Sequence, residues 1–339
     1  MKPFQWKHLL LWSVIAFLAS PVQSQESQDP KLVEAARREG EIVWYTSMSL
    51  DQSKELMDLF HKKYPFLKPS ILRTGGSSLL NRVLTEARAG KHLWDVLQAA
   101  GDKFGPLMEE NLLAPYFSPQ RNTHPEDLKD AKGYWTSVYV NPIVVGYNTQ
   151  LVKKEHVPRI YSDLLDPRWK GQKISIDDDY YTFLQGLILA WGKEKAVKFL
   201  KKLGGQDPVV MGGTTARIQL TIAGEFPLVI AYANILQNFA SKRAPIDWVP
   251  LEPAVVSVNS VMLGANARHP NAAKLFIDFV LSKEGQEKLW DFQRIPSRGD
   301  VKPKPSRLFR GYRRFVVHPG KFKNFNETIK LYKQIFKTR

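Results

Sequence analysis

Residues 134–147 have the sequence YWTSVYVNPIVVGY, a long extended stretch interrupted only by Asn141 and Pro142. Residues 248–264, WVPLEPAVVSVNSVMLG, form a second extended stretch with prolines at positions 250 and 253. Both stretches exceed the five or six residues of an ordinary strand. We therefore expect each stretch to cross from one domain into another, which predicts two domains with a cleft between them.

Strand-like and helical segments alternate on both sides of the first crossing. The strands predicted before the crossing are 41–46, 69–74 and 94–99, and the helices are 30–39, 50–64, 79–87 and 103–110. The strands predicted after it are 173–176, 209–211 and 228–233, and the helices are 182–191, 194–203 and 215–223. This alternation predicts parallel strands joined by crossover helices, and therefore an α/β fold.

The composition excludes several classes of protein. The chain has 339 residues, of which 43% are hydrophobic, and it contains no cysteine. That length and hydrophobic content are sufficient for one large or two ordinary domains. The lack of cysteine excludes disulfide scaffolds, thiolate zinc sites, iron–sulfur clusters and cysteine nucleophiles.

The N-terminus has the pattern of a signal peptide. Lys2 and Lys7 precede an uncharged apolar run, Leu9 to Ala19, and small or short residues follow it. We expect residues 1–24 to be a signal peptide that is cleaved after Ser24, and the protein to be exported. The apolar run is too short for a membrane-spanning helix.

The net charge of +16 is concentrated at the C-terminus. Residues 298–339 contain 13 Lys and Arg residues against Asp300 and Glu327. Aromatic residues are interleaved with these charges, as in surfaces that bind single-stranded nucleic acid, which leaves that alternative open. We favour a solvated basic face and expect no nucleic-acid partner.

No sequence motif indicates catalysis. The chain has no Walker sequence, no G-x-G-x-x-G, no G-x-S-x-G and no H-E-x-x-H, and its seven histidines are scattered. We therefore predict no enzymatic activity, no catalytic residue, no resident metal and no cofactor.

Short polar residues follow several predicted strands, where ligands bind in α/β sheets. They could equally be ordinary helix caps. From these turns we predict nine ligand-binding residues: Ser47, Ser49, Gly76, Ser77, Asp179, Tyr180, Thr214, Thr215 and Tyr232.

The run Asp177-Asp178-Asp179-Tyr180-Tyr181 allows different interpretations. Three adjacent carboxylates repel one another unless they are solvated, cap a helix N-terminus or bind a cation. Capping with solvation is at least as plausible as a site for Fe(III) or for an amine-bearing ligand.

Several longer phrases resemble the periplasmic solute-binding proteins of ABC importers, in particular the ferric-ion-binding branch of extracellular solute-binding family 1. They are residues 111–115 (NLLAP), 161–171 (YSDLLDPRWKG), 271–279 (NAAKLFIDF), 282–286 (SKEGQ) and 295–301 (IPSRGDV). The resemblance implies a type 2 periplasmic-binding-protein fold, in which two α/β domains share a hinge of two crossing strands. We divide the chain into domain 1 (25–138 and 255–297), domain 2 (139–254) and a basic helical tail (298–339) that packs on domain 2.

The resemblance implies a periplasmic protein that closes over a small ligand, delivers it to a membrane permease and acts as a monomer. The iron ligands of the family do not carry over, because Ser49, Ala100 and the stretch 232–234 stand at the matching positions. We therefore expect a small organic anion or zwitterion, with Arg73 or Arg217 supplying positive charge. The alternatives are a ferric-ion carrier with a rearranged Asp/Tyr site, a secreted enzyme, or the partner of a membrane sensor.

Overall fold

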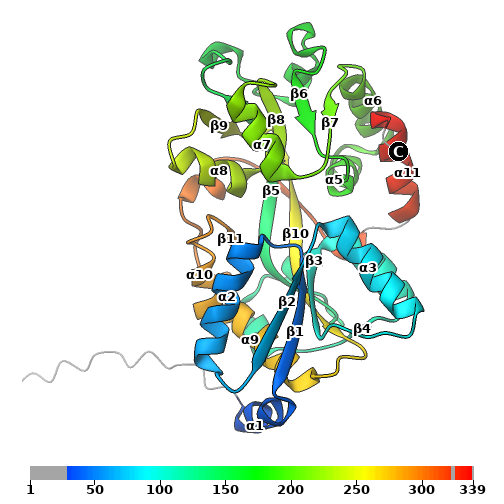
Figure 1. Ribbon diagram of the computed structural model, residues 1–339. Helices are drawn as coiled ribbons and strands as arrows, with labels where there is room; N and C mark the ends of the chain where they lie inside the picture. The colour runs from blue at the N-terminus through cyan, green and yellow to red at the C-terminus, as the bar shows by residue number, and fades with distance from the viewer. Residues whose placement is uncertain (1–28, 322–324, 338–339) are drawn as a thin grey trace, which may run out of the picture.

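The chain folds into two stacked lobes with a cleft between them (Figure 1). The structure, a computed structural model, describes residues 29–321 and 325–337. The predicted signal peptide, residues 1–24, lies outside this range. Within the described residues, no helix is long and apolar enough to cross a membrane.

Lobe A holds most of the N-terminal third of the chain together with a later helix pair. Its helices are α1 (Pro30–Glu39), α2 (Leu50–Lys63), α3 (Gly76–Arg88), α4 (Phe104–Glu109), α9 (Pro270–Leu281) and α10 (Lys283–Lys288). Its strands are β1 (Glu41–Thr46), β2 (Lys68–Arg73), β3 (Val96–Ala100), β4 (Leu113–Ala114) and β11 (Ile295–Pro296). The predicted start of α1 is confirmed, because the Asp29 side chain accepts a hydrogen bond from the Lys31 amide at 2.9 Å.

Lobe B is built from the middle of the chain and the C-terminal helix. Its helices are α5 (Tyr181–Trp191), α6 (Lys193–Gly204), α7 (Thr214–Ala223), α8 (Ala233–Ser241) and α11 (Phe325–Phe336). Its strands are β6 (Ile174–Ile176), β7 (Val209–Val210), β8 (Leu228–Tyr232) and β9 (Ile246–Val249). The predicted parallel pairing holds within each lobe, for β1 with β2 and β3 and for β6 with β7 and β8.

Two long strands cross between the lobes, as the sequence predicts. They are β5 (Thr136–Asn148) and β10 (Ala254–Gly264), which pair antiparallel with each other. In lobe A, β5 pairs with β10 up to Pro142, and from Ile143 onward it pairs with β8 and β9 of lobe B. Because both strands run on without a break, the exact domain bounds at 138/139 and 254/255 stay a prediction.

The second extended stretch is not one strand, which corrects the prediction for residues 248–264. Strand β9 ends at Val249 and belongs to the sheet of lobe B, and β10 starts only at Ala254. Proline has no amide hydrogen to donate to a strand ladder, so Pro250 and Pro253 separate the two strands. Helix α8 was not predicted, and it begins where the strand predicted at 228–233 ends.

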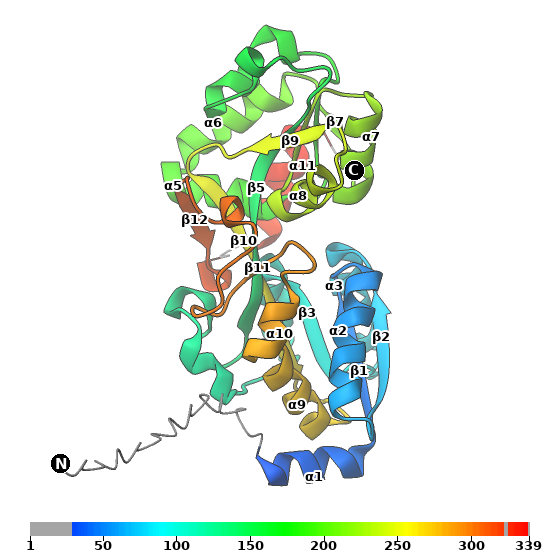
Figure 2. The same cartoon turned by 90° about the vertical axis from the view of Figure 1, so that its left-hand side faces the viewer.

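The C-terminal tail is helical only in part, which corrects the prediction for residues 298–339. Strand β12 (Arg314–Val317) pairs in parallel with the start of β10, where the lobes meet (Figure 2). In the described part of this tail α11 is the one long helix, and it lies against α5 and α6 of lobe B (Figure 1). There the Tyr332 ring contacts the Tyr181 ring at 5.5 Å between centroids.

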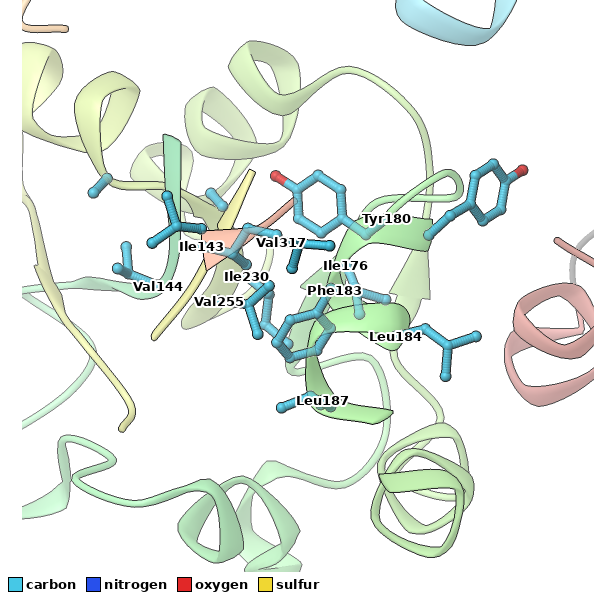
Figure 3. Packing of buried hydrophobic residues seen from close by; sticks show 14 of the residues in the cluster. Ile143, Val144, Ile176, Tyr180, Phe183, Leu184, Leu187, Ile230, Val255 and Val317 are labelled. Carbon is cyan, nitrogen blue, oxygen red and sulfur yellow. The ribbon is translucent and has the colours of Figure 1, made fainter. Parts of the chain in front are cut away.

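The core of lobe B reaches into the hinge. Ile143 and Val144 of β5 and Val255 of β10 pack in one cluster with Phe183 of α5 and Val317 of β12 (Figure 3). The same packing explains the glycine in the middle of α5. A Cβ atom on Gly186 would lie 2.4 Å from Val255 Cγ1 and 3.0 Å from Val317 Cγ2.

We expect Gly186→Ala to destabilise the protein, although alanine is the better helix former by about 1 kcal/mol. Valine side chains are stiff about χ1, so the clash with Val255 must move the hinge strand or α5. We expect a loss of about 1–3 kcal/mol in the free energy of unfolding, measured with urea.

The matched control is Gly75→Ala, because no atom lies within 4 Å of a Cβ built at that position. Equal effects of the two substitutions on urea unfolding would contradict the packing of α5 against the hinge.

Candidate functional site

A cleft of about 1220 Å³ lies between the lobes and is lined from both sides. All nine residues predicted from the sequence line this cleft. Ser47, Ser49, Gly76 and Ser77 come from lobe A, and Asp179, Tyr180, Thr214, Thr215 and Tyr232 come from lobe B. Their position at the cleft follows from the rule that polar turns gather at the carboxyl ends of parallel strands, and their contact with a ligand stays a prediction.

Five helices begin at this cleft. The N-cap residues of α2, α3, α5, α7 and α8 all line it, and they are Ser49, Gly75, Tyr180, Gly213 and Tyr232. In the described part of the chain, none of these five residues makes a side-chain capping hydrogen bond. The alternative that these polar turns serve only as side-chain caps is therefore wrong. At α5 two of the first amides are already used, because Tyr181 donates to the Asp179 carbonyl and Phe183 to the Tyr180 carbonyl. The N-termini of α2, α3, α7 and α8 can face an anion, which the helix dipoles also favour.

A buried hydrogen-bond chain supports the first of these turns. The Thr46 hydroxyl accepts a bond from the Met48 amide at 3.0 Å and donates to the Gln98 side chain at 3.3 Å. The Gln98 amide group donates in turn to the Asn259 side chain at 2.9 Å. Asn259 lies on the crossing strand β10 and lines the cleft. The turn that carries Ser47 and Ser49 is thus fixed to the hinge.

Arg294 brings a positive charge into the cleft and has no acidic partner among the described residues. Only 6% of the residue is exposed. Its Nε group donates to the Gln52 side chain at 2.9 Å, and its guanidinium lies 4.0 Å from the centre of the Tyr139 ring. Burial lowers the pKa of Arg294, and the nearby Tyr139 and Tyr232 oppose this effect.

Arg217, one of the two arginines expected to supply charge to a ligand, is already bonded to groups of the protein. The residue is 0% exposed, and its Nη2 lies 2.5 Å from the Asp177 carboxylate. Its Nη1 donates to the Ile230 carbonyl at 2.8 Å. Arg217 does not line the cleft, whereas the other candidate, Arg73, does.

Two predicted ligand contacts, Ser77 and Asp179, bond to each other across the cleft. The Ser77 hydroxyl on α3 of lobe A donates to Asp179 Oδ2 of lobe B at 2.9 Å. Burial opposes ionisation of Asp179, but Lys103, Asp177 and Ser77 outweigh it and lower its pKa. We call this hydrogen bond the latch, because it joins the two lobes.

The three consecutive aspartates do not cap α5, whose N-cap is Tyr180. Asp177 pairs with Arg217, Asp179 accepts the latch hydrogen bond, and Asp178 is exposed. Their carboxylate oxygens lie within 4.8 Å of one another, so the group has the spacing of a cation site. Arg217 and Lys103 already supply positive charge at this cluster.

Two asparagines present unpaired acceptors at the cleft. The side-chain oxygens of Asn141 on β5 and Asn234 on α8 are buried and have no hydrogen-bond partner among the described residues. Asn234 is 1% exposed. A buried acceptor without a donor costs about 1–3 kcal/mol, so both positions favour a ligand that carries O–H or N–H groups.

No sequence pattern indicated Arg294 or Lys103, which line the cleft, whereas Asn234 ends the stretch 232–234 that follows a predicted strand. Asn141 gave a weak signal, since it is a polar residue inside a long apolar strand. Arg294 gave none, because the chain has 49 Lys and Arg residues and only tertiary structure separates the buried ones from the rest.

Two α/β lobes with a polar cleft between them and two hinge strands define a protein that encloses a small solute. The chain belongs to the family of bacterial extracellular solute-binding proteins, whose sequence model matches residues 94–315. An uncharacterized protein of Haemophilus influenzae is 31% identical over 275 residues, which cover 76% of this chain and 77% of that protein. Membership implies a small-molecule ligand, an ABC permease as partner and a periplasmic location.

Solved structures confirm the type 2 periplasmic-binding-protein fold. Iron-bound HitA from Pseudomonas aeruginosa matches with a TM-score of 0.76 and 17% identity, over 87% of this chain and 99% of that one. AfuA from Actinobacillus pleuropneumoniae, with exogenous fructose-6-phosphate bound, matches with a TM-score of 0.71 and 23% identity, over 88% of this chain and 97% of that one. The predicted resemblance to ferric-ion-binding proteins is thus confirmed for the fold.

Asp177 gives the site a measurable pH dependence. Burial raises its pKa from 3.8 to about 7, and the neighbouring Asp179 adds to this against the effect of Arg217. Between these values the folded protein keeps a proton that the unfolded chain releases, so stability falls as the pH rises. We expect the stability difference between wild type and Asp177→Asn to fall from pH 4 to pH 7, by up to about 1.4 kcal/mol per pH unit.

Urea unfolding of both proteins across this pH range measures the difference. Taking the difference removes the contribution of other buried carboxyls such as Asp278, whose pKa burial raises to about 6. A difference that grows with pH would show that Arg217 keeps Asp177 ionised.

Proposed function

We propose that this protein captures a small organic anion or zwitterion in the cleft and delivers it unchanged to the permease of an ABC importer. The lobes close around the ligand by rotation about β5 and β10, and the closed form is what the permease recognises. Ser47, Ser49, Gly76, Ser77, Asp179, Tyr180, Thr214, Thr215 and Tyr232 would contact the ligand or hold the closed cleft around it.

The buried guanidinium of Arg294 is the observation that carries this proposal. A charge taken out of water is costly unless it is paired, and the described residues offer Arg294 no carboxylate. An oxyanion of the ligand would supply the missing charge through bidentate hydrogen bonds. Arg73 and Arg294 both act on the pKa of Tyr139, so the two cations lie near one part of the cleft.

The unpaired acceptors argue for an organic ligand instead of a bare inorganic anion. Asn141 lies two residues beyond Tyr139 on β5, so both side chains point to the same face of the sheet. Since Tyr139 stacks on Arg294, the Asn141 oxygen lies near the proposed anion position. A ligand with an anionic group and neighbouring hydroxyl or amino groups would satisfy Arg294 and Asn141 together.

A ferric-ion carrier is the second candidate, favoured by the three clustered aspartates and by the Tyr180 and Tyr232 rings, 5.2 Å apart. Against it, no histidine and no glutamate line the cleft in the described part of the chain. The chain would therefore need a set of ligands different from the one that the family resemblance implies.

We further propose that the protein acts as a monomer, without catalysis and without a resident cofactor or nucleic-acid partner. Cleavage after Ser24 would release the mature protein into the periplasm. Tight binding with recovery of an intact ligand would support transport, and turnover of the ligand would favour the secreted enzyme. A neighbouring gene for a membrane receptor instead of a permease would favour the sensor partner.

Native mass spectrometry of protein purified from its own periplasm should reveal a bound organic anion that mild denaturation releases. With that compound as the probe, we expect Arg294→Gln to weaken binding about 100-fold in calorimetry, because an ionic hydrogen-bonded contact is lost. The ligand-free variant should melt at the same temperature as wild type or higher, since a buried unpaired charge is gone.

Arg310→Gln is the matched control, because Arg310 is exposed and lies outside the cleft. Unchanged affinity of Arg294→Gln, or equal losses in both variants, would refute Arg294 as the anion anchor.

Addition of Fe(III) to the purified protein separates the two candidates. We expect no visible tyrosinate-to-iron charge-transfer band, because the cleft lacks the imidazole and glutamate of the expected iron site. A stable coloured complex whose band is lost in Tyr232→Phe would support the ferric-ion carrier and overturn the organic-anion proposal.

A further inference from the structure

The C-terminal helix α11 lies beyond the residues that match the family, 94–315, yet it reaches the binding cleft. Lys333, Phe336 and Lys337 line the cleft. The helix stands beside α5 in lobe B and on the same side of the molecule as α3 of lobe A (Figure 1). Helix α11 therefore forms part of the cleft wall, and the proposed binding function assigns it no role.

One side chain of α11 bonds directly to residues 177–179, which we call the aspartate turn. The Tyr332 hydroxyl donates to the main-chain carbonyl of Asp177 at 2.5 Å, across 155 residues of sequence. Tyr332 is 0% exposed, and its ring packs edge-on against the Tyr181 ring, just after the turn. Burial raises the pKa of Tyr332 well above its ordinary value, so the hydroxyl keeps its proton for this bond.

The aspartate turn also contains Asp179, the acceptor of the latch hydrogen bond. Asp177 and Asp179 are two residues apart and interact with each other, and Asp179 accepts the hydrogen bond from Ser77 of lobe A. Phe183 and Leu184 anchor the start of α5 in the core (Figure 3). The Tyr332 hydroxyl holds the turn through its bond to the Asp177 carbonyl. Loss of the Tyr332 bond would free the carbonyl of Asp177 and let Asp179 move away from Ser77.

We propose that Tyr332 is a positioning residue for ligand capture: through Asp177 it holds Asp179 where the latch can form, so that α11 favours lobe closure. The inference rests on the proposed capture by closure. It does not depend on which ligand is captured. Tyr332 acts through the turn and need not contact the ligand itself.

The test measures the distance between the lobes in the full mature chain without any ligand. Because the chain has no cysteine, Asn81→Cys on α3 and Gln219→Cys on α7 give two exposed sites for spin labels. Pulsed electron paramagnetic resonance then gives the populations of open and closed forms. We expect Tyr332→Phe and Ser77→Ala each to raise the ratio of open to closed form about fivefold, as expected for loss of one hydrogen bond.

Tyr312→Phe is the matched control. Its hydroxyl also donates to a main-chain carbonyl of the tail, that of Leu308, but Tyr312 lies outside the cleft. We expect its distance distribution to equal that of wild type. Melting curves of all variants confirm that they are folded, since Tyr332→Phe keeps the ring contacts with Tyr181 and Phe336.

The double variant Ser77→Ala with Tyr332→Phe separates positioning from a general structural effect. If Tyr332 acts through the latch, the double variant is no more open than Ser77→Ala alone. Additive opening, or an unchanged distribution in Tyr332→Phe, would overturn the inference. Because no ligand is present, an error in the proposed ligand class leaves these outcomes unchanged.

Discussion

The antiparallel pairing of β5 with β10 is the constraint on which the rest of the molecule depends. Every residue of β10 is buried, and nearly all of β5 is, so the pair is held by backbone hydrogen bonds and by core packing. A change in the relative position of the lobes must therefore bend these two strands. Asn141 and Asn259 lie on the same strands and line the cleft, so the hinge is also part of the binding surface.

A buried positive charge is available to a ligand only when no carboxyl group of the protein bonds to it. Arg217 and Arg294 are both buried arginines near the cleft, yet Arg217 has Asp177 at 2.5 Å, whereas Arg294 has the Gln52 amide oxygen and the Tyr139 ring but no carboxylate among the described residues. The carboxyl group of Asp177 already bonds to Arg217, whereas the buried charge of Arg294 calls for a counterion from outside. The same reasoning applies to the unpaired amide oxygens of Asn141 and Asn234.

The family fold provides a cleft but does not fix its ligand. HitA is described with iron and AfuA with fructose-6-phosphate, and both share this fold at low identity. The donors that line the cleft are chiefly hydroxyls, amides, helix N-termini and arginines, which suit oxyanions better than Fe(III). The tail adds a feature of its own, because β12 joins the hinge and α11 reaches the aspartate turn.

The sequence by itself determined the alternation of strands and helices, the two crossings and the nine predicted residues that line the cleft. These features depend on local patterns, and the carboxyl ends of parallel strands come together in any sheet of this type. Only the tertiary structure decided which arginine is free, that Ser77 bonds Asp179, and that Tyr332 reaches Asp177. Those facts depend on hydrogen bonds between residues 40 to 155 positions apart, and no local pattern encodes such pairings.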